Sequence, residues 1–92
     1  MDEQILRSTI AERLQVMRDL AGLSPEEITA KTGNKISPSY IRRLEKGENS
    51  PTVEAVAFIC AACRTTLAKF FSSFPAELFE LPELAGERKR RA

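Results

Sequence analysis

Two helix-start signatures stand in tandem between residues 23 and 47, and they restrict this stretch to a pair of short helices joined by a turn. In each signature a serine that can cap a helix, Ser24 or Ser37, is followed by proline, which suits the first helical position. Glu27 stands where a capping-box partner reaches back to the first cap. Helices of two or three turns with few apolar residues do not fold alone in water. The flanking segments must therefore supply a core for this pair.

The flanking segments have the patterns of further helices. Apolar residues recur at steps of three and four from residue 5 to 21, which is the period of an amphipathic helix. Residues 53–63 are apolar almost all round, as in a central buried helix. The candidate caps are Asp2 or Ser8 for the helix at residues 5–21, and Ser50 or Thr52 for the helix at residues 53–63. A short fifth helix is expected at residues 67–74, where leucine and phenylalanine side chains close the core.

These elements predict an all-α fold with five helices. The expected domain covers residues 1–74, and residues 75–92 form a C-terminal arm with a basic tail. No apolar run approaches the roughly 20 residues of a transmembrane helix, and the first residues lack the basic start of a signal peptide. We therefore expect a cytoplasmic protein without a membrane association.

The second helix of the pair has an apolar face and a basic face. At about 100° per residue, Ile41 and Leu44 point to one side. Polar and basic side chains occupy the opposite side: Ser39, Arg42, Arg43 and Lys46. The planar fork of arginine matches two acceptors on a guanine edge, and lysine suits a phosphate. Residues 31–46 hold five basic residues and one acid in a chain of net charge +1, so the positive charge is local.

Both helices together resemble the lambda repressor and Cro-like helix-turn-helix family, also called the Xre family. The similarity covers residues 10–71, roughly two thirds of the chain, and the string Ile41 to Gly47 followed by Ser50-Pro51 is its most specific part. It implies a five-helix lambda-repressor-like domain and a sequence-specific DNA-binding transcriptional regulator, a repressor of bacterial or phage type associated with the nucleoid. Its third helix would enter the major groove, and a homodimer would read two half-sites about 34 to 36 Å apart.

The expected DNA contacts come from the helix pair and the loop after it. The residues assigned to DNA binding are Ser24, Lys35, Ser37, Ser39, Tyr40, Arg42, Arg43, Lys46 and Asn49. Phosphate contacts are expected from Ser24, Lys35 and Asn49. Base-edge contacts are expected from Ser39, Arg42 and Arg43, and Lys46 suits either role.

Two of these assignments have alternatives. Asn49 either approaches a phosphate or only shapes its turn, and Tyr40 either bonds a phosphate or packs against the first helix of the pair. The resemblance also implies that Arg18 pairs with Glu45, which ties the first helix of the chain to the third. We therefore interpret Arg18 as structural.

The chain departs from the family pattern at three places. Pro25 stands where a glutamine commonly contacts a phosphate, and Thr29 stands where a small alanine lets the two helices pack closely. The turn is longer by about two residues, since residues 33–35 precede Ile36. These changes bear on the angle between the two helices more than on the fold.

The C-terminal arm has two interpretations. Its apolar residues, Phe74, Leu78, Phe79 and Leu81, either contact a second subunit or fold back over their own core. The homodimer that the resemblance implies favours the contact with a second subunit. Several glutamates make the arm acidic, which argues against contact with DNA.

Other classes of function receive less support. Cys60 and Cys63 have the C-x-x-C spacing of redox and zinc sites, but they stand in an apolar helix of a chain without histidine, so we expect core residues. No motif of a hydrolase or of a nucleotide-binding loop is present. We therefore expect no enzyme, no catalytic residue, no metal site and no cofactor. The alternative function is a protein-binding module, such as an antitoxin or anti-repressor, that uses the same fold or its C-terminal arm.

Overall fold

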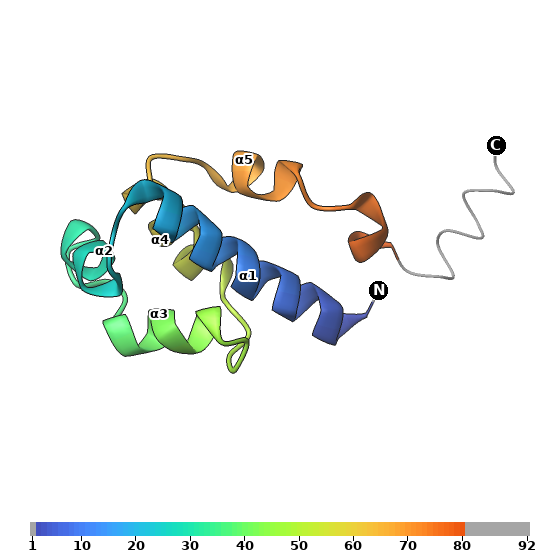
Figure 1. The fold of residues 1–92 in the computed structure, drawn as a ribbon, viewed down its shortest axis with the longest axis horizontal. Coiled ribbons are helices and arrows are strands. Elements are labelled where there is room, and N and C mark those ends of the chain that lie inside the picture. Colours follow the sequence, from blue (N-terminus) through green and yellow to red (C-terminus); the bar gives the residue numbers. More distant parts are fainter. Residues whose placement is uncertain (1, 81–92) are drawn as a thin grey trace, which may run out of the picture.

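The computed structural model describes residues 2–80, which form five α-helices and a 3-10 turn (Figure 1). The elements are α1 (Glu3–Ala21), α2 (Pro25–Lys31), α3 (Pro38–Glu45), α4 (Val53–Ala62), α5 (Leu67–Ser72) and η1 (Ala76–Phe79). The long helix α1 crosses the middle of the molecule, with α3 on one side and α5 on the other (Figure 1). The predicted all-α fold is confirmed. Within residues 2–80 no helix is both long enough and apolar enough to cross a membrane.

Side-chain caps fix where the flanking helices begin. An oxygen of Asp2 accepts hydrogen bonds from the backbone N–H groups of Gln4 and Ile5 at 2.9 and 3.1 Å, so α1 begins after Asp2. Thr52 caps α4 by accepting from the N–H of Ala55 at 3.1 Å. Each such cap typically stabilises a helix by about 1 kcal/mol. The alternative caps Ser8 and Ser50 are not used, because the helices begin at the earlier and the later candidate respectively.

One hydrophobic core joins all five helices. The largest side chains that are fully buried are Leu14, Ile28, Ile41, Leu44, Ile59 and Cys60. Helix α4 buries only part of its surface, since Val53 and Phe58 are exposed. The expectation of a central buried helix therefore holds for the face of α4 that carries Ala55, Val56, Ile59 and Cys60, and not for Val53 and Phe58.

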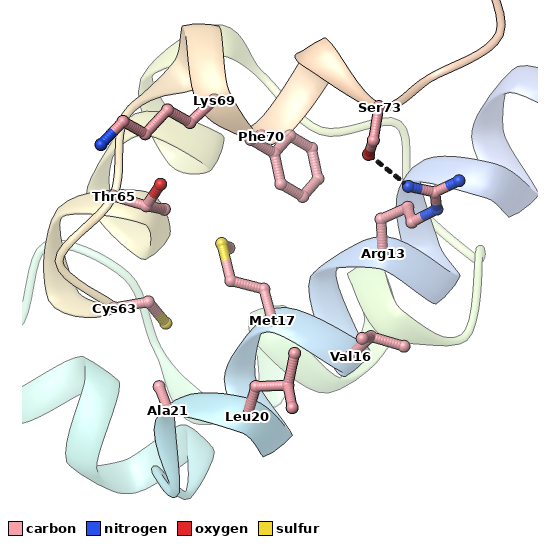
Figure 2. Close-up of a pocket in the computed structure, with 10 residues that line it drawn as sticks. All are labelled: Arg13, Val16, Met17, Leu20, Ala21, Cys63, Thr65, Lys69, Phe70 and Ser73. Carbon is pink, nitrogen blue, oxygen red and sulfur yellow. Dashed lines mark hydrogen bonds between the residues drawn. The ribbon is translucent and has the colours of Figure 1, made fainter.

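The end of the described chain folds back over its own core. Phe74 is only 7% exposed, and its ring lies 5.4 Å from that of Phe70 and 5.2 Å from the guanidinium carbon of Arg13. Arg13 also donates a hydrogen bond to the hydroxyl of Ser73, just before Phe74 (Figure 2). The assignment of Phe74 to a dimer contact is therefore corrected, because α5 ends at Ser72 and the following turn directs the ring inward.

The rest of the predicted arm is only partly described. Leu78 packs against the core and is half-buried, whereas Phe79 is exposed at its edge with its ring 6.0 Å from that of Phe74. Leu81 and the basic tail lie outside the described residues. Up to Glu80, the chain follows the second of the two interpretations of the arm.

Candidate nucleic-acid interface

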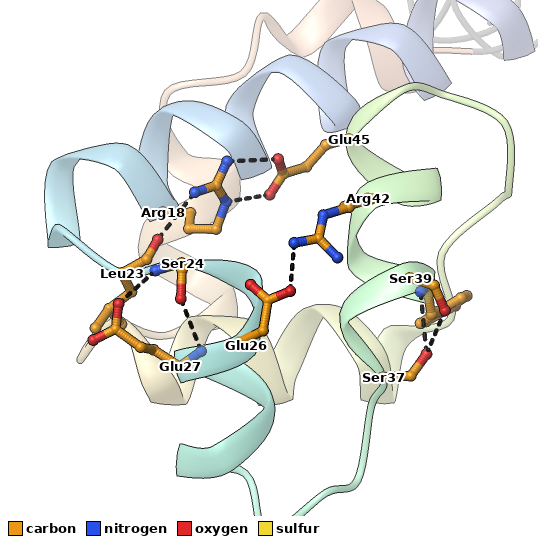
Figure 3. A network of polar contacts seen from close by, with 10 residues as sticks. Arg18, Leu23, Ser24, Glu26, Glu27, Ser37, Ser39, Arg42 and Glu45 are labelled. Atoms are coloured by element: carbon orange, nitrogen blue, oxygen red, sulfur yellow. Dashed lines mark hydrogen bonds and ion pairs between the residues drawn. The ribbon is translucent and has the colours of Figure 1, made fainter.

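The start of α2 is a complete capping box. The Ser24 hydroxyl accepts from the backbone N–H of Glu27 at 3.1 Å, and the Glu27 carboxylate accepts from the N–H of Ser24 at 2.9 Å (Figure 3). Hydrogen bonding from Ser24 to the Glu27 carboxylate lowers the pKa of that carboxyl, the backbone N–H of Ser24 having a larger effect than its side chain. The backbone N–H and the hydroxyl of Ser24 are thus both used inside the capping box at the start of α2.

The turn between α2 and α3 has two successive residues in the left-handed region. Gly33 has φ 67° and Asn34 has φ 63°. The N–H of Asn34 donates to the carbonyl oxygen of Thr29 at 3.0 Å, which closes the end of α2. Asparagine is one of the few residues with a side chain that tolerates this region. The longer turn therefore reverses the chain compactly, and Lys35 is exposed beside it.

Helix α3 presents its polar face outward. Ser37 caps it by accepting from the N–H of Tyr40 at 3.1 Å, and Ile41 and Leu44 are buried in the core. The four polar and basic residues of the predicted recognition face are all exposed: Ser39, Arg42, Arg43 and Lys46. The face of α3 that was predicted to contact DNA is therefore accessible to a ligand.

A bidentate ion pair between Arg18 and Glu45 connects α3 to α1. The Nε and one terminal nitrogen of Arg18 donate to the two carboxylate oxygens of Glu45 at 2.7 and 2.9 Å (Figure 3). The other terminal nitrogen donates to the carbonyl oxygen of Leu23 at 3.0 Å, just before α2. The Arg18 and Glu45 side chains are 15% and 10% exposed, and the hydrogen bond to Glu45 raises the pKa of Arg18. One arginine thus joins α1, the start of α2 and the end of α3.

Arg42 is paired across the two helices of the motif. It donates from a terminal nitrogen to the carboxylate of Glu26, in the first turn of α2 (Figure 3). The Arg42 and Glu26 side chains are 50% and 57% exposed, so this pair lies at the surface. The hydrogen bond from Arg42 lowers the pKa of the Glu26 carboxyl, and the backbone N–H of Glu26 lowers it further. No local pattern in the sequence indicates this role of Glu26, because the two paired residues are 16 positions apart.

The other predicted contacts flank this face. The guanidinium carbon of Arg43 lies 5.9 Å from the centre of the Tyr40 ring, a cation–π distance, while that ring also packs against the core. The Tyr40 ring therefore contacts the Arg43 guanidinium independently of what the Tyr40 hydroxyl binds. The hydroxyls of Ser37 and Ser39 lie 3.3 Å apart at the start of α3. Asn49 is half-buried in the loop after α3.

The two cysteines lie in or beside the core. Cys60 is buried, and burial raises the pKa of its thiol to about 11. Cys63 is half-buried at the end of α4, and burial raises the pKa of its thiol as well. Reactive cysteines need the thiolate form, which a raised pKa disfavours. This geometry supports the prediction that both are core residues.

The fold and the basic face of α3 define a helix-turn-helix module of the DNA-binding kind. The chain belongs to the helix-turn-helix domain family, whose model matches residues 9–70. The resemblance noted from the sequence is therefore confirmed. No curated protein matches the chain significantly.

Solved structures of transcriptional regulators have the same fold. The clp gene regulator ClgR from C. glutamicum is 25% identical, with a TM-score of 0.64 over 73% of this chain and 83% of that one. A regulator of the HTH_3 family from Vibrio cholerae is 28% identical, with a TM-score of 0.70 over 84% of this chain and 42% of that one. The restriction-modification controller protein C.Esp1396I was solved as a tetramer with its 35 base-pair operator. It is 19% identical, with a TM-score of 0.70 over 85% of this chain and all of that one. At this identity the similarity shows the fold alone.

Proposed function

We propose that this chain is a sequence-specific transcriptional regulator of bacterial or phage type that represses by inserting α3 into the major groove of an operator. The observation that carries the proposal is the outward face of α3, where Arg42, Arg43 and Lys46 are exposed opposite the buried Ile41 and Leu44. A regulator of this kind acts in the cytoplasm, where the DNA is.

The proposed contacts divide by chemistry. Arginine and serine side chains on α3 read base edges: Ser39, Arg42 and Arg43. Groups around the helix ends hold phosphates: Ser24, Lys35, Ser37, Tyr40 and Asn49. Lys46 stands at the C-terminal end of α3, where a flexible ammonium group reaches a phosphate or a base edge.

We propose a homodimer as the active form. One α3 spans a single half-site, and two copies related by a two-fold axis read half-sites about 34 to 36 Å apart. Of the arm residues first assigned to a dimer contact, Phe79 is the one that lies exposed in the described chain.

A salt titration tests the DNA contact. Binding to random duplex DNA is measured over a range of salt concentrations for the wild type and for Arg42→Ala/Arg43→Ala. Each phosphate contact contributes about 0.9 to the slope of log affinity against log salt, so the variant should lose affinity and show a smaller slope. The control, Arg7→Ala/Lys69→Ala, removes the same charge from α1 and α5 and should keep the slope. Absence of binding at low salt would refute the proposal.

A second candidate function, protein binding, is favoured by an apolar groove between α1 and α5. The groove has a volume of about 380 Å³, and Val16, Met17 and Phe70 line it (Figure 2). Leu20 at its edge is 84% exposed, which is unusual for a leucine side chain. This function predicts a protein partner that still binds when Arg42, Arg43 and Lys46 are all alanine and that is lost with Leu20→Asp. Loss of the partner in the triple variant would count against it.

A further inference from the structure

We propose that Glu26 is a specificity-determining residue, which positions Arg42 for one base pair and keeps it from binding phosphates indiscriminately. This inference rests on the proposed function. The family resemblance assigned Glu26 no role.

The geometry of the pair leaves Arg42 able to read a base. A guanidinium has five N–H donors, and Glu26 accepts from one terminal nitrogen of Arg42. Within residues 2–80, Glu26 is the only side chain that the structure pairs with Arg42. Reading a guanine takes two donors, so the guanidinium can bond Glu26 on one edge and the base on another.

The pair also removes freedom that would otherwise be lost on binding. Arginine is among the side chains with the most rotamer entropy, and ordering such a side chain at an interface costs about 0.5 to 1.5 kcal/mol. Glu26 is anchored in the first turn of α2, and α2 and α3 are held by their buried residues Ile28 and Ile41. The pair therefore favours one placement of the Arg42 guanidinium, beside Glu26, before DNA arrives (Figure 3).

The charge of Glu26 also limits what Arg42 does away from its base. The carboxylate satisfies part of the charge of Arg42. Arg42 therefore attracts a phosphate less strongly where no matching base is in place, which reduces binding to wrong sequences more than binding to the right one.

Three variants test the inference. Glu26→Ala removes the acceptor and the charge. Glu26→Asp keeps the charge but shortens the reach to Arg42. Glu77→Ala makes the same change of charge on η1, which lies at the opposite end of the molecule from α2 (Figure 1). Affinities are measured for an operator selected from a random library, for that operator with single base pairs changed, and for random duplex.

The expected result is a loss of discrimination. Glu26→Ala should bind random duplex several-fold more tightly, with a salt slope steeper by up to about 0.9 as Arg42 finds a phosphate. The ratio of operator affinity to random-duplex affinity should fall about tenfold. Glu26→Asp should lower the ratio without tightening random binding, and Glu77→Ala should change neither quantity. In an Arg42→Ala background, Glu26→Ala should no longer relax the preference at the base pair that Arg42 reads.

The outcomes separate the inference from the proposed function. If the wild type discriminates between sequences and Glu26→Ala keeps the same ratio, the inference is wrong and the function stands. If the change in ratio persists without Arg42, Glu26 acts only as a general charge and the inference is also wrong. If the wild type binds no DNA at low salt, the proposed function fails and the inference fails with it.

Discussion

Replacing Arg18 with methionine would leave Glu45 as a nearly buried carboxylate without its partner. Methionine has a similar length, so most of the packing of the side chain along α1 remains. The variant loses both hydrogen bonds to Glu45 and the bond to the carbonyl oxygen of Leu23. The effect therefore measures what the charged group contributes to holding α3 against α1.

The structure sets the size of the effect. Breaking a buried ion pair by removing one partner costs about 3 to 5 kcal/mol, because the other charge is stranded. The two side chains here keep 15% and 10% exposure, so water reaches the edge of the pair and we expect about 2 to 4 kcal/mol. The stability of a domain of this length is about 5 to 14 kcal/mol. The variant should thus lose a large share of it.

The two single variants should differ. Without Glu45, Arg18 keeps the Leu23 carbonyl and the carboxylate of Asp19 at 3.4 Å, so Glu45→Met should cost less, about 1 to 2 kcal/mol. The double variant removes both charges and should be no worse than Arg18→Met alone, since an apolar pair often replaces an ion pair without loss. Arg42→Met breaks an exposed pair and should leave the unfolding midpoint nearly unchanged.

Urea unfolding followed by far-ultraviolet circular dichroism measures these differences, since the chain has no tryptophan. A loss below about 1 kcal/mol for Arg18→Met would refute the reasoning. Additive losses in the double variant would refute it as well, because independent effects mean that the two charges do not stabilise each other.

Two further predictions concern stability. The hydroxyl oxygen of Thr29 is buried and has no hydrogen-bond partner within residues 2–80, so Thr29→Val should stabilise the domain by about 1 kcal/mol; a midpoint of urea unfolding that falls would contradict this. Burial raises the thiol pKa of Cys60 from 9.0 to about 11 in the folded state. Between pH 9 and pH 11 the folded form therefore keeps a proton on this thiol that the unfolded form has lost. Stability present below pH 9 should therefore decline by up to about 3 kcal/mol as pH rises to 11, and Cys60→Ala should lack this part of the decline in thermal unfolding.

Local signals in the sequence predicted the parts of the fold that local interactions determine. The serine caps of α2 and α3 act over three residues, and both helices begin where the sequence placed them. The exposed face of α3 followed from the helical period. The turn was harder, because asparagine only tolerates the left-handed region, and its presence did not establish that Asn34 would follow Gly33 into it.

Contacts between distant residues could not be found in this way. Arg18 and Glu45 are 27 positions apart, and only the family resemblance suggested their pair. Phe74 was expected at the end of the fifth helix and assigned to a dimer contact, whereas α5 ends at Ser72 and the following turn decides which way the ring points. Glu26 and Arg42 meet only once the angle between α2 and α3 is set.

Helix α3 takes part in two acid–arginine pairs, and it supplies the acid in one and the arginine in the other. In the buried pair, α3 supplies the acid, Glu45, and the scaffold supplies the arginine, so the pair fixes the helix itself. In the exposed pair, α3 supplies the arginine, Arg42, and the scaffold supplies the acid, so the pair fixes a reading side chain. Exposed pairs contribute little to stability, which leaves Arg42 free to bond DNA without loosening the fold. Loss of Arg18 should therefore weaken binding to every sequence alike, whereas loss of Glu26 should reduce the discrimination between sequences.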